Sequence, residues 1–296
     1  MKKQTAFFLF VACIMFIVSS QAPAQTGKYG VGTNAVFKGP VGLQLYSLRE
    51  IFKTDLDAGL KQTTDFGFQY VELTQVVTKN KTCDEIVAKL AQHKLKAIAA
   101  GWSFADFEKD PEKVIREAKA FGVEYAGCYS IPHKRGGFTE AECRKAIEVF
   151  NRAGRLLAKE GIKLFYHNHG YEFVPFKNGT MFDLLVQETD PKAVFFELDV
   201  MWVIFPGHDP VALVKKYPGR FPLFHLKDLK KGVEGNLSGG TDVKNDVALG
   251  TGQADYHTLL KAAQENGTKY YFIEDESPDV LKQIPVSLKF LESVTW

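Results

Sequence analysis

The sequence predicts a single α/β domain folded as a closed (β/α)8 barrel, a TIM barrel. Eight short apolar or β-rich segments alternate with eight helical patterns, which indicates parallel strands joined by helices. No Gly-x-Gly-x-x-Gly follows the first expected strand, so the main signature of a doubly wound sheet is missing. Candidate functional residues follow many different strands rather than one, as in a barrel. The domain is expected over residues 40–296, the usual size for this fold.

The expected strands are short and rich in apolar and β-branched side chains. They cover residues 41–46, 70–73, 96–100, 124–129, 163–167, 193–199, 223–227 and 270–275. The expected helices repeat apolar residues every three or four positions. They cover residues 55–66, 82–93, 111–121, 139–160, 181–188, 210–217, 256–266 and 280–291. A capping box of Thr139 and Glu142 marks one helix start, and Gly122 and Gly161 stand where left-handed C-caps are expected.

Residues 1–24 have the organisation of a secretory signal peptide. Lys2 and Lys3 precede an apolar run over residues 6–18, and Ala22-Pro23-Ala24 is a small-x-small cleavage site. The apolar run of about 13 residues is too short to span a bilayer. Cys13 raises the alternative of a lipoprotein signal, but the apolar stretch before it is very short. We therefore expect cleavage after Ala24, secretion across the inner membrane into the periplasm, and no membrane attachment afterwards.

The mature chain then starts with an N-terminal extension over residues 25–39. Without Lys2 and Lys3, the 37 basic residues fall to 35 and equal the 35 acidic ones. A formally neutral chain without a basic stripe does not suit nucleic acid. Three cysteines remain, with neither a Cys-x-x-Cys pair nor the even number of a disulfide framework. The oligomeric state stays open, and a homo-oligomer is compatible with the sequence.

Four metal-ligand residue types stand at the ends of four successive expected strands. They are His167, Asp199, His225 and Glu274. Parallel strands of a barrel open on one face, so these side chains can converge there. Two imidazoles and two carboxylates suit one divalent ion of Mn, Co, Fe or Zn better than Ca.

Side-chain parity strengthens this prediction. Alternate residues of a strand share a face, which pairs His167 with His169, Glu197 with Asp199, His225 with Lys227, and Glu274 with Glu276. Any one of these residues alone would be explained by a satisfied polar group in the core. Burying all of them would be costly without a metal ion or mutual pairing.

Five segments resemble the sugar phosphate isomerase/epimerase family, whose members have a xylose-isomerase-like barrel. They are GLQLYSLR at 42–49, YHNH at 166–169 with Glu172 and Phe173, ELDxxW at 197–202, HLKD at 225–228, and ALGxGxxD at 248–255. The resemblance implies metal-ligand roles for Asp199, His225 and Glu274. Many relatives have Glu where this chain has His167, so either His167 or His169 could be the fourth ligand. We choose His167 and expect His169 to line the sugar site.

The resemblance also implies chemistry next to a carbonyl, in which a base removes a carbon-bound proton beside a metal-held oxygen. The candidates for the catalytic groups are Glu274, His169, Lys227 and Glu197. The candidates for substrate binding are Gln44, Tyr46, Glu72, Trp102, Asn168, Glu172 and Trp202. Tyr46, Trp102 and Trp202 could stack on a sugar ring, although Trp102 could equally be a core residue. Glu72 could equally be a hydrogen-bond acceptor behind the site.

The leading hypothesis is a secreted, metal-dependent isomerase or epimerase of a non-phosphorylated sugar or keto-sugar. One alternative keeps the site and changes the outcome to β-elimination, as a 3-keto-glycoside lyase or hydrolase. Another is an inactive barrel that only binds a small-molecule sugar or glycoside. The Gly-rich stretch 229–252 lies on the expected ligand face, where long loops are often lids.

Overall fold

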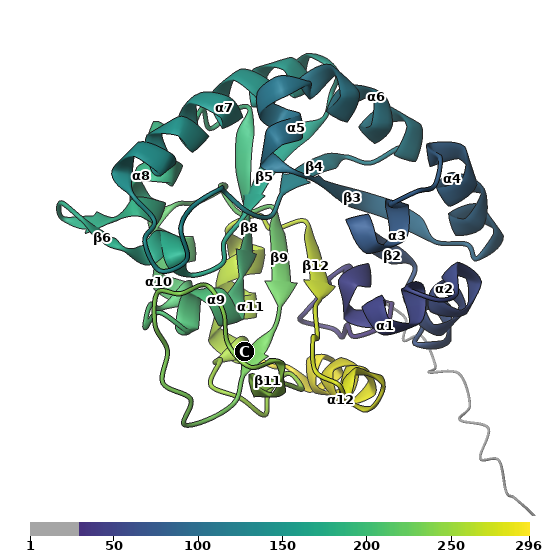
Figure 1. Cartoon of the computed structure of the whole chain (residues 1–296). Helices are drawn as coiled ribbons and strands as arrows, with labels where there is room; N and C mark the ends of the chain where they lie inside the picture. Colours follow the sequence, from purple (N-terminus) through teal and green to yellow (C-terminus); the bar gives the residue numbers. More distant parts are fainter. Residues whose placement is uncertain (1–29) are drawn as a thin grey trace, which may run out of the picture.

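A computed structural model describes residues 30–296, and it shows eight parallel strands closed into one barrel with helices outside (Figure 1). The strands follow one another around the barrel in chain order, and the first, β1, pairs with the last, β12. The fold prediction is therefore confirmed. The predicted signal peptide, residues 1–24, and part of the predicted extension lie outside the described residues.

All eight barrel strands fall within or close to the predicted segments. They are β1 (Val41–Gln44), β2 (Tyr70–Leu73), β3 (Lys96–Trp102), β4 (Tyr125–Cys128), β5 (Lys163–His167), β8 (Val194–Asp199), β9 (Leu223–Leu226) and β12 (Tyr270–Ile273). Two small antiparallel ribbons lie outside the barrel. They are β6 (Pro175–Phe176) with β7 (Gly179–Thr180), and β10 (Asp228–Leu229) with β11 (Asp246–Val247).

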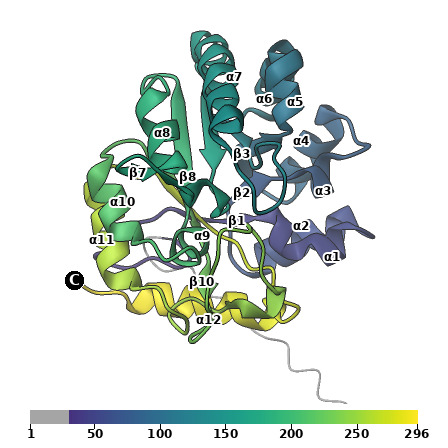
Figure 2. The same cartoon turned by 60° about the vertical axis from the view of Figure 1, so that its left-hand side comes forward.

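The eight predicted helices are present, and the longer ones cover the outside of the barrel (Figures 1 and 2). They are α2 (Leu56–Asp65), α4 (Cys83–Gln92), α6 (Pro111–Phe121), α7 (Glu140–Lys159), α8 (Met181–Glu188), α10 (Pro210–Lys216), α11 (Tyr256–Glu265) and α12 (Val280–Ser293). Four shorter helices were not predicted. They are α1 (Arg49–Phe52), α3 (Gln75–Thr78), α5 (Phe104–Lys109) and α9 (Val200–Ile204). Three 3-10 turns complete the fold, η1 (Leu45–Leu48), η2 (Tyr171–Phe173) and η3 (Val243–Asn245).

The predicted helix signals have the expected geometry. The Thr139 hydroxyl accepts a hydrogen bond from the Glu142 N–H, and the Glu142 carboxylate accepts one from the Thr139 N–H. Gly122 ends α6 with a φ of 68°, in the left-handed region that glycine adopts without a steric penalty.

The barrel interior has an apolar end and a polar end. Phe165 and Phe272 pack with Ile98, Tyr125 and Leu223 in a cluster separate from the main core. Two residues further along β5, on the same face of the strand, comes His167. A Cβ on Gly127 would lie 2.2 Å from the Phe165 ring, so a glycine is required beside this large side chain. The aromatic layer fills one end and leaves the carboxyl ends of the strands for polar groups.

The segment before β1 packs against the end of the chain. The Asn34 amide donates hydrogen bonds to the carbonyls of Leu291, Glu292 and Val294. Phe37 is fully buried, and its ring meets Tyr271 edge-on at 5.0 Å. Among residues 30–296, no helix combines the length and apolar character needed to cross a bilayer.

Candidate metal centre and active site

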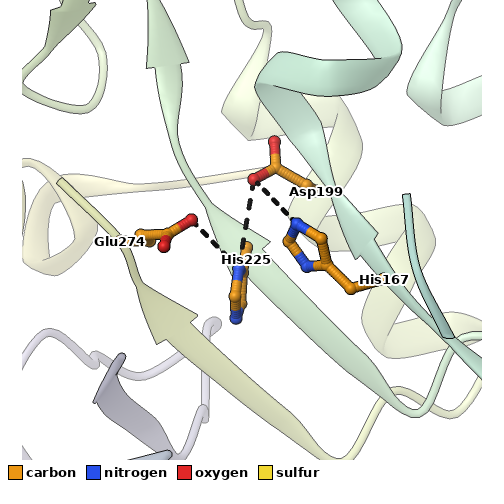
Figure 3. A group of neighbouring side chains, drawn as sticks. All are labelled: His167, Asp199, His225 and Glu274. Carbon is orange, nitrogen blue, oxygen red and sulfur yellow. Dashed lines mark ion pairs between the residues drawn. The ribbon is translucent and has the colours of Figure 1, made fainter. Parts of the chain in front are cut away.

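The four predicted metal ligands lie together at the carboxyl ends of β5, β8, β9 and β12 (Figure 3). One potential donor atom from each of His167, Asp199, His225 and Glu274 lies within 4.8 Å of all the others, and all four residues are buried. Asp199 Oδ2 is 3.8 Å from His167 Nε2 and 3.9 Å from His225 Nδ1. Glu274 Oε2 is 3.2 Å from the same His225 nitrogen.

The two carboxylate oxygens of Asp199 have different partners. Oδ1 caps α9 by accepting a hydrogen bond from the Trp202 N–H at 2.9 Å. The Asn168 amide bridges the backbone N–H and C=O of Asp199, at 3.0 and 3.3 Å. The Asp199 backbone and one oxygen are therefore fixed, and Oδ2 is left facing the two histidines.

These residues fit a divalent cation. Asp199 Oδ2 and His225 Nδ1 are buried and have no hydrogen bond of good geometry within the described residues, although Glu274 Oε2 lies 3.2 Å from the His225 nitrogen. A buried acceptor or imidazole nitrogen without a partner is unfavourable, and a cation between them would satisfy both. The mixed set of two nitrogens and two oxygens suits a transition metal or zinc.

Burial and neighbouring charges shift the pKa values of the candidate ligands. Burial raises the pKa of Asp199 to about 7. Burial also favours the neutral form of His167, and with the nearby His225 it holds the pKa of His167 well below its usual value. Burial opposes ionisation of His225 as well, but Glu197 and Glu72 raise its pKa well above the usual value.

Two further carboxylates lie behind the histidines. Glu197 Oε2 is 3.1 Å from His167 Nδ1 and 3.0 Å from His225 Nε2. Glu72 Oε2 is 2.9 Å from the same nitrogen of His225. Both glutamates are fully buried. Burial and the neighbouring Glu72 raise the pKa of Glu197 well above its usual value.

A buried lysine stands beside the cluster. Lys227 Nζ is 3.1 Å from Glu274 Oε2, donates to Glu276 and lies 3.7 Å from Asp246 Oδ2. Burial opposes its charge, but these carboxylates raise the pKa of Lys227 well above its usual value. The same lysine, with His225, holds the pKa of Glu274 well below its usual value despite burial. Lys227 is therefore a cation and Glu274 an anion.

A cavity of about 380 Å³ opens above the cluster. Its wall contains Gln44, Tyr46, Thr74, Tyr129, His167, His169, Met201, Trp202, His225, Lys227, Asp246, Glu274, Glu276 and the segment 239–243. Its volume lies within the range of small-molecule sites.

A comparison of the sequence with models of protein families identifies the family of this chain. Residues 60–294 match the sequence profile of the xylose isomerase-like TIM barrel family. The chain belongs to this family.

Several known proteins resemble this family member in sequence or in fold. An inosose dehydratase of Geobacillus thermodenitrificans is 30% identical over 153 residues, which are 49% of this chain and 51% of that protein. The chain thus spans about half the length of the curated relatives it matches. A sugar phosphate isomerase/epimerase from Parabacteroides distasonis superposes with a TM-score of 0.73 at 23% identity, over 92% of this chain and 99% of that one. The IOLI protein, solved with a bound zinc atom, has a TM-score of 0.64 at 15% identity, over 85% of this chain and 95% of that one.

Several residues predicted for substrate binding or catalysis do line the cavity of this xylose isomerase-like barrel. They are Gln44, Tyr46, His169, Trp202, Lys227 and Glu274. Burial lowers the pKa of His169 to about 4, and its Nδ1 forms no hydrogen bond within the described chain. His169 is therefore a neutral imidazole with an unused nitrogen at the cavity wall.

Five other predicted residues lie outside the cavity wall, and their partners explain why. The Trp102 indole N–H donates to Glu117 of α6 at 2.6 Å, so this ring belongs to the outer layer. Asn168 is occupied by the Asp199 backbone. Glu172 is fully buried, where it accepts from the Tyr166 hydroxyl and the His169 N–H. Glu72 and Glu197 face the histidines from behind.

The sequence prediction missed several cavity residues. Tyr129 directly follows β4 with the inward parity of Tyr125 and Gly127, so alternation alone could have identified it. Asp246 and the segment 239–243 come from the irregular stretch between β9 and α11, where no periodic pattern exists. This stretch does lie over the cavity, on the face predicted for it.

Proposed function

We propose that this protein is a divalent-metal-dependent enzyme that removes a carbon-bound proton next to a carbonyl group of a sugar or keto-sugar. The observation that carries the proposal is the buried group of His167, Asp199, His225 and Glu274 at the floor of a ligand-sized cavity. When bound there, a divalent cation would polarise a carbonyl oxygen and offset the negative charge that develops as the neighbouring carbon loses its proton.

The cavity contains both proton acceptors and a charged hydrogen-bond donor. His169 is unprotonated and Glu274 is ionised, so each can accept a proton. Lys227 is charged and can donate a hydrogen bond to an oxygen that gains negative charge. Trp202 presents an aromatic ring on the His169 side, with the two ring centroids 6.1 Å apart, and can stack on the apolar face of a sugar.

The substrate we propose is not phosphorylated. Among the described residues, Lys227 is the one lysine or arginine in the cavity wall, and its ammonium already contacts Glu274 and Glu276. Asp242 and Asp246 add two further carboxyl groups. A phosphate would therefore meet mostly like charge, whereas neutral hydroxyl groups would find hydrogen-bond acceptors.

Two outcomes compete once the proton has left. Return of the proton to another carbon or face gives isomerisation or epimerisation. Loss of a substituent from the next carbon gives β-elimination, as in a keto-glycoside lyase. The inosose dehydratase relatives favour this second outcome, because a dehydratase removes water from its substrate. Their match spans only half of each chain, so the first outcome stays the leading proposal.

Proton NMR in deuterated water tests the proposal. The protein is freed of metal, reloaded separately with Mn, Co, Fe or Zn, and incubated with neutral aldoses, ketoses and 3-keto-glycosides. We expect metal-dependent exchange of a carbon-bound hydrogen. A new stereocentre or moved carbonyl identifies an isomerase or epimerase, and a released aglycone with an unsaturated keto-sugar identifies a lyase. If sugars bound but no carbon-bound hydrogen exchanged with any member of the panel, the protein would be an inactive sugar-binding barrel.

We also propose export to the periplasm, on the strength of the signal-like residues 1–24. N-terminal sequencing of the protein isolated from its natural host should start at Gln25. A protein that retains Met1 or Lys2 and stays in the cytoplasm would refute this proposal without touching the catalytic one.

A further inference from the structure

One carboxylate oxygen contacts both candidate histidine ligands. Glu197 Oε2 lies 3.1 Å from His167 Nδ1 and 3.0 Å from His225 Nε2. Glu197 is fully buried in β8 and does not line the cavity. It cannot touch a substrate without a rearrangement, so its effect must pass through the imidazoles.

The two rings present opposite nitrogens to the centre. His167 turns Nε2 toward Asp199, whereas His225 turns Nδ1 toward Asp199 and Glu274 (Figure 3). A neutral imidazole has one nitrogen with a proton and one with a lone pair, and the hydrogen bond on one side decides which is which. An acceptor behind both rings would hold both protons on the outer nitrogens.

We propose that Glu197 is the positioning residue of the metal centre, which in the metal-bound protein fixes His167 as the Nδ1–H tautomer and, together with Glu72, His225 as the Nε2–H tautomer. The inference rests on the metal centre of the proposed function, but not on any particular sugar or reaction. Both lone pairs then face Asp199 Oδ2, where a cation would be held. Hydrogen-bond acceptors behind metal-bound histidines commonly serve this purpose.

The two histidines depend on Glu197 to different extents. The hydrogen bond of His225 Nε2 goes to Glu72 Oε2 at 2.9 Å, and Glu197 Oε2 is a further close neighbour of this nitrogen at 3.0 Å. Glu72 is in turn held by the Tyr129 hydroxyl, which donates to its Oε1 at 2.5 Å. Within the described residues, Glu197 is the one carboxylate that contacts His167 Nδ1. Loss of Glu197 should therefore free the tautomer of His167 more than that of His225.

Nitrogen-15 NMR of the zinc-loaded wild-type protein tests the tautomers directly. Long-range correlations between ring protons and ring nitrogens distinguish protonated from metal-bound positions. We expect a proton on Nδ1 of His167 and on Nε2 of His225, with zinc at the other nitrogen of each. The reverse pattern at either ring would overturn the proposal. No change in the fold of a variant can confuse this result.

Three variants test the dependence on the acceptor. Glu197→Met keeps the length of the side chain but removes both acceptor oxygens, and zinc affinity should fall about 10–100-fold. Glu197→Gln retains one acceptor oxygen and should bind zinc more tightly than Glu197→Met. Glu172→Gln is the matched control, because this buried glutamate contacts neither ligand ring, and its zinc affinity should equal that of wild type.

The outcomes separate this inference from the proposed reaction. Zinc bound with the expected tautomers in a protein that turns over no sugar would refute the reaction alone. Equal zinc affinity of Glu197→Met and wild type would refute the positioning role alone. Binding of two zinc ions per chain with Glu197 as a direct ligand would also overturn it, since the carboxylate would then hold metal rather than a histidine proton.

Discussion

At the scale of single residues, Asp199 and His225 each use one side-chain atom for a contact within the fold and direct another toward the candidate metal position. Asp199 caps α9 with Oδ1 and leaves Oδ2 to the centre. His225 faces Glu72 and Glu197 with one nitrogen and the centre with the other. The fixed contacts are made by the fold before any ligand arrives, so binding does not have to order these side chains.

Asp199→Asn separates the two tasks of this residue. An asparagine can still cap α9 through its side-chain oxygen, so the melting temperature of the metal-free protein should change little. Replacing the charged ligand should lower zinc or cobalt affinity by more than the 10–100-fold typical of residues behind a ligand. Competition with a chromophoric chelator measures this. Asp209→Asn, at the cap of α10, is the control and should bind metal normally.

Glu172 should make stability depend on pH. Burial raises its pKa to about 7, against the usual 4.5 of a glutamate. A raised carboxyl pKa means that the folded state prefers the proton, so its stabilising effect is complete below pH 4.5 and is lost as the pH rises to 7. The difference of about 2.5 pKa units corresponds to roughly 3 kcal/mol.

Urea unfolding of wild type and Glu172→Gln at several pH values checks this. The free energy of unfolding of wild type should fall relative to that of the variant between pH 4.5 and 7, by up to roughly 3 kcal/mol. Parallel curves for the two proteins would mean that the pKa of Glu172 is the same in the folded and unfolded protein, and would contradict the expectation.

At the scale of elements, the roof of the cavity comes from the loop between β10 and β11. Gly239 has a φ of 66°, and a Cβ there would lie 2.8 Å from the Tyr171 ring and 3.3 Å from the His169 carbonyl oxygen. The loop therefore rests on the segment that follows β5. Because Gly239 also lines the cavity, its close approach to Tyr171 and His169 determines how near the loop comes to the rest of the cavity wall.

Gly239→Ala should move the loop between β10 and β11 away from the rest of the cavity wall. The substitution must displace Tyr171 or the loop, and losing about 1 kcal/mol of substrate contact would raise KM about fivefold with a smaller change in kcat. Gly232→Ala is matched, because Gly232 has a φ of 79° in the same loop but open space around its Cα hydrogens. Both variants carry similar backbone strain. An equal rise of KM in both would show that strain, not the Tyr171 contact, controls the cavity.

Alternation of side chains along strands explains what could be predicted from the sequence. Short apolar and β-rich segments predicted the eight strands, and side-chain parity at their ends placed His167, Asp199, His225 and Glu274 on one face, because both are local properties. Trp102 shows the limit of this reasoning. It also ends a strand, but its indole turns outward to Glu117, a helix residue 15 positions later. A local sequence pattern cannot reveal a hydrogen-bond partner that lies on a different element.

At the scale of the whole molecule, the candidate metal centre joins the last four strands of the closed barrel. β5, β8, β9 and β12 are neighbours in the barrel, and each contributes one candidate ligand near its end. The strands also pair through their backbones, so the fold does not require the metal for its architecture. A bound cation would nevertheless connect four segments that are distant in sequence, and it would have no such site in the unfolded chain.

Metal removal should therefore lower the melting temperature without unfolding the protein at room temperature. At a free zinc concentration 100 times the dissociation constant, binding stabilises the folded state by about 2.7 kcal/mol, which is roughly 5–10 °C for a domain of this size. Calorimetry with and without a chelator measures the shift. His225→Ala should abolish it, because both Asp199 and Glu274 lose their shared neighbour. His257→Ala should keep it, since His257 lies on α11, contacts the Thr295 carbonyl and is not part of the cavity wall. A zinc-induced shift that survived His225→Ala would mean that the ion binds elsewhere on the barrel.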